Sequence, residues 1–189
     1  MEYSQEQYKK DQKRFGLMAS LPIVVAITHL LFTVIYMSIV TAHQDGTYGN
    51  VFLLGEMFAT SSFGAILIGQ GGSETAIRSL PAMLGVVLGL AMIFLSTSAV
   101  KGKKLPYYIS FGVYLFDSVM IIPAMLCSIF LTGSGIHYMV VDYFITILLH
   151  LIFIGLFLYG VRIIKRMEDY EVKLALQANT IHITKGDTL

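Results

Sequence analysis

Charged residues are scarce in this sequence. Only 13% of its 189 residues are charged, whereas 56% are hydrophobic, and a soluble domain carries roughly 25% charged residues. The deficit means that most of the molecular surface does not face water. The composition therefore excludes an ordinary soluble domain and predicts that lipid is the main solvent of the fold.

Cysteine occurs once and tryptophan not at all. Because Cys127 is alone, an intramolecular disulfide, a redox centre of two cysteines and a zinc site of several thiolates are excluded. It lies in an apolar run and is expected to be a small buried residue. Tyrosine must then supply the aromatic belts at the membrane interfaces. The expected belt residues are Tyr107, Tyr108 and Tyr159 near the inner face and Tyr36 and Tyr138 near the outer face.

Motifs for binding nucleotides and metals are also missing. The sequence contains no phosphate-binding glycine loop, no dinucleotide fingerprint and no HExxH zinc helix. The net charge of +1 provides no basic field to hold a phosphate backbone, which argues against nucleic acid as a partner. No metal or cofactor is therefore assigned, and the sequence favours a protein that is not an enzyme.

What the sequence does contain is a set of long apolar segments. A helix needs about 20 apolar residues to cross a bilayer, and the predicted spans are about 17–41, 80–100, 106–132 and 139–164. The first is too long for a signal-peptide core and follows a polar stretch, so we expect it to be retained. The expected fold class is all-α, a polytopic membrane protein with a four-helix transmembrane domain over 17–166.

Lysine and arginine set the expected orientation, because they concentrate on the cytoplasmic side of membrane proteins. With four spans, the basic residues of 1–16, 101–104 and 162–166 all lie on one side, and only Arg78 lies on the other. If 51–69 also crossed, the last two clusters would move outside.

The four-span arrangement therefore predicts a cytoplasmic N-terminal segment 1–16 and a cytoplasmic tail 167–189. The predicted location is a cell membrane, either a plasma membrane or a bacterial inner membrane. Residues 42–79 form an external loop, in which 51–69 lies on the membrane or dips into it and packs against the helices.

Three ionisable residues lie near the middle of predicted spans: His29, Asp117 and His150. Such residues are rare because they cost about 2.5–3.5 kcal/mol on insertion scales. At about 1.5 Å per residue, each lies roughly 16–18 Å from one end of its span, so all three share a level. Other polar residues recur beside them at helical spacing, which predicts a buried polar seam. These stripes comprise His29, Thr33 and Tyr36, then Ser110, Tyr114, Asp117 and Ser118, and finally Asp142, Thr146 and His150.

Three interpretations of this seam stay open. In the first, the polar side chains hydrogen-bond one another and only fix helix register. In the second, an aspartate beside neutral histidines relays a proton or an ion. In the third, two histidines ligate a haem iron, or the histidines and the aspartate hold a divalent metal.

Four further residues are secondary candidates. Glu56 would face the seam if 51–69 dips into the bundle and would be solvated if that segment lies flat on the membrane, which the nearby serine and threonine residues favour. Asp142 lies near the outer end of its span, where it would reach water or headgroups. Gly85 and Gly89 form a GxxxG ridge, which lets another helix approach closely, either within the chain or from a second copy.

The sequence thus leaves three function hypotheses. The leading one is a small transporter-like or channel-like protein or subunit that moves a proton, ion or small solute along the seam. The second is a non-catalytic scaffold or accessory subunit, and the third is a haem-binding or metal-binding redox protein. The expected partners are the lipid bilayer and either other membrane subunits or a second copy of the chain.

Overall fold

The computed structural model describes residues 3–42, 54, 74–123 and 136–186, with side chains over 3–35, 54, 83–123 and 144–178. All regular secondary structure in this part of the chain is helical, as the sequence predicted. The helices are α1 (Gln5–Ala19), α2 (Leu21–Ala42), α4 (Glu74–Val100), α5 (Lys104–Val119) and α7 (Ile136–Gly186).

Four stretches of these helices are long and apolar enough to cross a membrane. They are Gln5–Ile35, Met83–Val100, Lys104–Pro123 and Phe144–Ala178. Large apolar side chains on them point away from the bundle; Phe94, for example, is 73% exposed. Contiguous apolar surface of this kind is rare on soluble monomers and suits contact with lipid.

The first apolar segment is divided into two helices at Ser20. Pro22 has no amide hydrogen for the carbonyl of Met18, and its ring crowds that carbonyl, so one continuous helix is unfavourable. Instead, Ser20 closes α1 by donating from its backbone amide and its hydroxyl to the carbonyl of Leu17, at 3.2 and 2.7 Å. The predicted span 17–41 therefore begins as the last turn of α1 and continues as α2.

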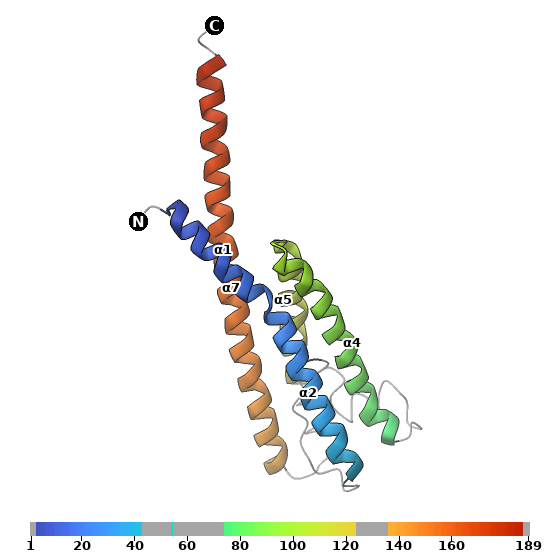
Figure 1. The fold of residues 1–189 in the computed structure, drawn as a ribbon. Coiled ribbons are helices and arrows are strands. Elements are labelled where there is room, and N and C mark those ends of the chain that lie inside the picture. Colours follow the sequence, from blue (N-terminus) through green and yellow to red (C-terminus); the bar gives the residue numbers. More distant parts are fainter. Residues whose placement is uncertain (1–2, 43–53, 55–73, 124–135, 187–189) are drawn as a thin grey trace.

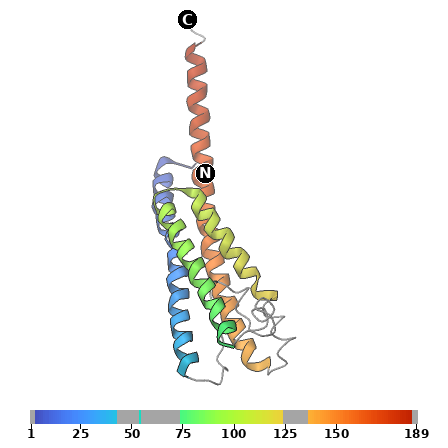
Figure 2. The ribbon, with the colours of Figure 1, turned by 90° about the vertical axis from the view of Figure 1, so that its right-hand side faces the viewer.

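The helices pack in chain order around a narrow interior. α2 lies along α4, α4 contacts α5, α5 contacts α7, and α7 returns to touch α2. Figures 1 and 2 show α2, α4, α5 and the first half of α7 side by side, with α1 crossing α7 at one end. We call this the α1 end of the bundle.

Helix α7 is much longer than a membrane span. Its 51 residues correspond to roughly 75 Å. The sequence placed a boundary at 166, but the helix continues through it to Gly186 and projects alone beyond the bundle (Figures 1 and 2). Residues 171–178 of this projection are exposed.

Aromatic rings fill the core at the α1 end. Tyr107, expected in an interfacial belt, is instead fully buried between Phe15 and Phe157. Its hydroxyl donates to the carbonyl of Phe157 at 3.2 Å, which satisfies the phenol inside the core. Gly160 makes room for the ring, since a Cβ at this position would overlap the Tyr107 hydroxyl.

Candidate functional site

His29 is seated between two helices and has no exposed surface. Helix α2 carries it, and Thr33, one turn further along, places its hydroxyl 3.3 Å from His29 Nε2. On the other side the imidazole lies against Gly85 of α4, where a Cβ would overlap the ring. Gly85 therefore provides the space that His29 occupies. Gly89, the other ridge residue, packs more loosely, and a Cβ there would lie 3.6 Å from Ala26.

Leu54 packs against Gly85 on another side of this position. It is fully buried, and its carbonyl oxygen would lie 2.9 Å from a Cβ on Gly85. It is the one residue between 43 and 73 that the structure describes. At Leu54, therefore, the chain that connects α2 to α4 reaches the bundle interior. The candidate Glu56 lies outside the described residues.

His150 occupies a comparable position on α7, where it is 2% exposed. Its Nδ1 lies 2.7 Å from the hydroxyl of Ser118 on α5, and its ring stacks on Tyr114 with centroids 5.1 Å apart and planes 10° apart. The serine hydroxyl donates to the carbonyl of Tyr114 at 2.7 Å.

These two contacts assign the tautomer of His150. A serine hydroxyl has a single proton, and Ser118 uses it for the Tyr114 carbonyl. Nδ1 must then be the donor in the bond between His150 and Ser118. In the neutral form of such an imidazole, the lone pair lies on Nε2.

The two histidines belong to one polar interior. His29 on α2 and His150 on α7 lie far apart in the sequence but near enough in the fold for positive charges on the two rings to repel each other. Asp117, the third predicted residue, is 5% exposed and lies on the buried face of α5 with Tyr114 and Ser118. The structure thus brings all three predicted residues to the inside of the bundle.

Thr146 adds a further hydroxyl to this interior. It lies one helical turn before His150 and is almost completely buried. Within the part of the chain that the structure describes, its Oγ1 has no hydrogen-bond partner. A buried hydroxyl without a partner costs about 1–3 kcal/mol. Asp142, another turn earlier, is in α7, but its side chain is outside the described set.

Comparison with protein-family models, with curated proteins and with solved structures finds no match. The site is therefore interpreted from its own geometry. Among the described residues, no three of histidine, cysteine, aspartate and glutamate gather closely enough to hold a metal ion.

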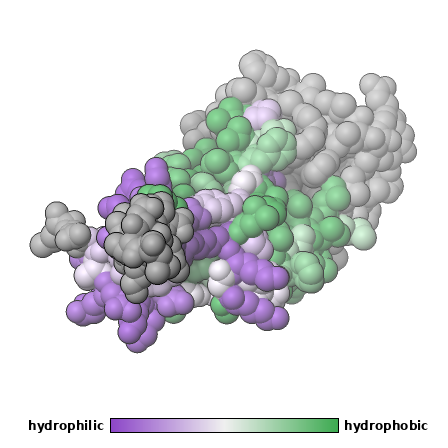
Figure 3. Space-filling view, turned by 90° about the horizontal axis from the view of Figure 1, so that it is seen from above, coloured by the Kyte–Doolittle hydropathy of each residue, from purple (hydrophilic) through white to green (hydrophobic). Residues whose placement is uncertain are grey.

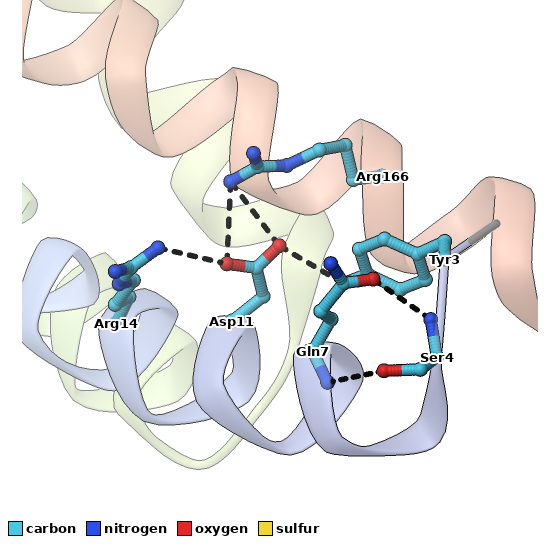
Figure 4. Close-up of polar contacts among 6 residues, drawn as sticks. All are labelled: Tyr3, Ser4, Gln7, Asp11, Arg14 and Arg166. Carbon is cyan, nitrogen blue, oxygen red and sulfur yellow. Dashed lines mark hydrogen bonds and ion pairs between the residues drawn. The ribbon is translucent and has the colours of Figure 1, made fainter. Parts of the chain in front are cut away.

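A second polar cluster lies at the α1 end and was not identified from the sequence (Figure 4). Its centre is Asp11 of α1, which is 3% exposed. The carboxylate accepts from the Tyr3 hydroxyl at 2.9 Å and forms ion pairs with Arg166 of α7 at 3.1 Å and Arg14 at 3.5 Å. Burial, together with the hydrogen bond to Asp11, raises the pKa of Tyr3 to about 12.

Neighbouring contacts join the same elements. Glu171 of α7 pairs with Lys104 of α5 at 2.6 Å and accepts from the Tyr8 hydroxyl at 2.7 Å. The rings of Tyr3 and Tyr8 both pack on Tyr170. These contacts attach α1 to the base of the α7 projection.

One sequence signal did mark this helix. Ser4 and Gln7 form a capping box. The Ser4 hydroxyl accepts a hydrogen bond from the backbone N–H of Gln7, and the side-chain oxygen of Gln7 accepts one from the backbone N–H of Ser4. The S-x-x-Q pattern predicts a helix start at this position. Nothing in the sequence indicated which residue of α7 would pair with Asp11.

Proposed function

We propose that this chain is a small multi-pass membrane protein that relays a proton, or a solute or ion coupled to a proton, through the seam of His29, Asp117 and His150. In this proposal the four apolar stretches cross the bilayer and both termini lie in the cytoplasm. The observation that supports it is the burial of ionisable side chains on three helices: His29 on α2, Asp117 on α5 and His150 on α7.

The chemistry of these groups suits proton transfer. An imidazole can accept a proton on one nitrogen and release one from the other, and it titrates near physiological pH in water. In His150 the donor and acceptor nitrogens are already distinguished by the bond to Ser118. The Thr33 hydroxyl lies one helical turn from His29, and the Thr146 hydroxyl lies one turn from His150. Each hydroxyl can donate and accept hydrogen bonds along a path of proton transfer.

The burial of these groups also supports a functional role. Ionisable side chains inside a membrane are expensive, so those that are present commonly mark ion or proton pathways. Packing alone would be better served by apolar residues of similar volume. The space beside Gly85 is filled by the His29 imidazole, so a larger side chain at position 85 would displace the ring. This close fit is consistent with a functional requirement for the position of the imidazole.

The test is proton flux into proteoliposomes that contain a trapped pH-sensitive dye. Under an imposed membrane potential, Asp117→Asn is expected to lower the flux about 100-fold or more, because the amide cannot exchange a proton. Gly112→Ala is the matched control on the same helix, since a Cβ there meets nothing within 4 Å. Flux in Asp117→Asn equal to that of the wild type would refute the relay.

An accessory-subunit role is the second candidate, and one observation favours it. The projection of α7 extends far beyond the bundle, and residues 171–178 are exposed along it. If this helix carries the function, its removal would abolish the cellular role of the protein, whereas variants of the seam would leave that role intact.

A further inference from the structure

Exposed basic side chains lie on three parts of the chain at the α1 end of the bundle. Six of them form what we call the basic collar, and all are exposed. The collar consists of Lys9 and Lys13 on α1, Lys101 and Lys103 in the turn between α4 and α5, and Arg162 and Lys165 on α7. Figure 3 views the molecule from this end and shows hydrophilic surface around α7, with hydrophobic surface beyond it.

The collar residues are not engaged by neighbouring acids. In the described part of the chain, the ion pairs at this end involve other cations. Those cations are Lys10, Arg14, Lys104 and Arg166. The collar therefore presents positive charge that no acidic side chain of the described residues neutralises.

The collar lies at the rim of the apolar surface. Val100 is the last residue of the exposed apolar stripe on α4, and Lys101 follows it directly. On α7, Leu158 and Tyr159 are exposed just before Arg162. Long basic side chains at such a rim can place their charge among lipid headgroups while their methylene groups stay with apolar surface.

We propose that the basic collar binds the headgroup phosphates of anionic phospholipids. The spread of the collar over α1, the turn between α4 and α5, and α7, at the edge of an apolar surface, fits the headgroup layer of a membrane better than it fits a separate acidic protein. Each lysine or arginine near an anionic leaflet strengthens binding by roughly fivefold. This inference rests on the membrane insertion in the proposed function, but not on the relay.

The test uses the full-length protein in nanodiscs of equal parts phosphatidylcholine and phosphatidylglycerol. After mild detergent extraction, the phospholipids retained on the protein are measured by mass spectrometry. The wild type is expected to retain phosphatidylglycerol with an enrichment of about fivefold or more. The enrichment should fall at about 1 M salt, where the Debye length is about 3 Å.

The variant combines Lys9→Gln, Lys13→Gln, Lys101→Gln and Lys103→Gln, and its enrichment in phosphatidylglycerol should be clearly lower than that of the wild type, because only Arg162 and Lys165 of the collar remain. Lys173→Gln removes one positive charge from the exposed projection, outside the collar; it is the control and should behave as the wild type. Unchanged enrichment in the fourfold variant, or no enrichment in the wild type, would overturn the collar proposal alone. Failure of the protein to enter nanodiscs would overturn membrane insertion as well.

Discussion

Gly85 is the residue on which the geometry of the candidate site depends most directly. Its missing side chain is the space that the His29 imidazole occupies, and the carbonyl of Leu54 closes the same space from another direction. Gly89 belongs to the same ridge on the same helix, yet its surroundings leave room for a methyl group. The two glycines therefore form a matched pair for mutation.

Gly85→Ala is expected to lower stability by about 1–3 kcal/mol, because the new methyl group forces His29 or the α4 backbone to move. Gly89→Ala should be neutral or slightly stabilising, since its contact is ordinary and alanine favours helix by up to about 1 kcal/mol. Thermal unfolding in detergent measures both. Equal midpoints for the two variants would show that His29 does not lie on Gly85.

At the residue scale, the sequence predicted a level for each candidate residue but not its contacts. Counting residues from the ends of the apolar runs placed His29 and His150 at one level, because the rise of a helix is constant. The choice of Ser118 and Tyr114 as neighbours of His150 depends on how α5 is rotated against α7, which no residue count gives. Tyr107 was misplaced for the same reason, since a tyrosine at a span end can face either lipid or the core.

Helix α1 and its attachment to α7 are the main features at the scale of elements. The Asp11 carboxylate holds two arginines and a tyrosine, and Glu171 joins α1, α5 and α7 nearby. Helix α1 is joined directly to α2 at Ser20. The attachment of α1 therefore also helps to set the position of α2, which carries His29. Asp11 thus fixes the orientation of an element that reaches the candidate site.

Asp11→Asn is expected to weaken the docking of α1 by about 1–2 kcal/mol, a value discounted because both arginines are about half exposed. Hydrogen exchange of the α1 amides should accelerate about 10-fold, while exchange in α4 stays unchanged. Glu6→Gln is the control, since Glu6 pairs only with Lys10 on the exposed face among the described residues. Equal exchange in Asp11→Asn and Glu6→Gln would show that the buried cluster does not hold α1.

Helix boundaries were predictable where the chemistry of the chain changes sharply. The basic segment 101–103 separates α4 from α5, as its charge predicted, whereas the division between α1 and α2 lies inside the predicted span 17–41 and was not predicted. The end of α7 was not predictable, because the sequence beyond 166 changes in polarity but contains no proline or glycine before Gly186 to stop a helix. A helix can continue from lipid into water, so the end of an apolar run predicts the end of a membrane span but not the end of the helix.

At the scale of the whole molecule, polarity changes along the bundle axis. Apolar side chains face outward along the helices, polar groups are enclosed at His29 and His150, and charge gathers at the α1 end (Figure 3). A protein of this form places its titratable interior between two aqueous compartments if its four apolar stretches cross the membrane. Both the relay and the basic collar depend on that arrangement.

Labelling of single cysteines tests the four crossings most directly. In a Cys127→Ser background, a membrane-impermeant maleimide is applied to intact cells carrying Gly46→Cys, Lys103→Cys or Lys165→Cys. The account predicts that Gly46→Cys reacts from outside, whereas Lys103→Cys and Lys165→Cys react only after permeabilisation. Labelling of Lys103→Cys and Lys165→Cys in intact cells would mean that 51–69 also crosses, and it would contradict the four-span arrangement.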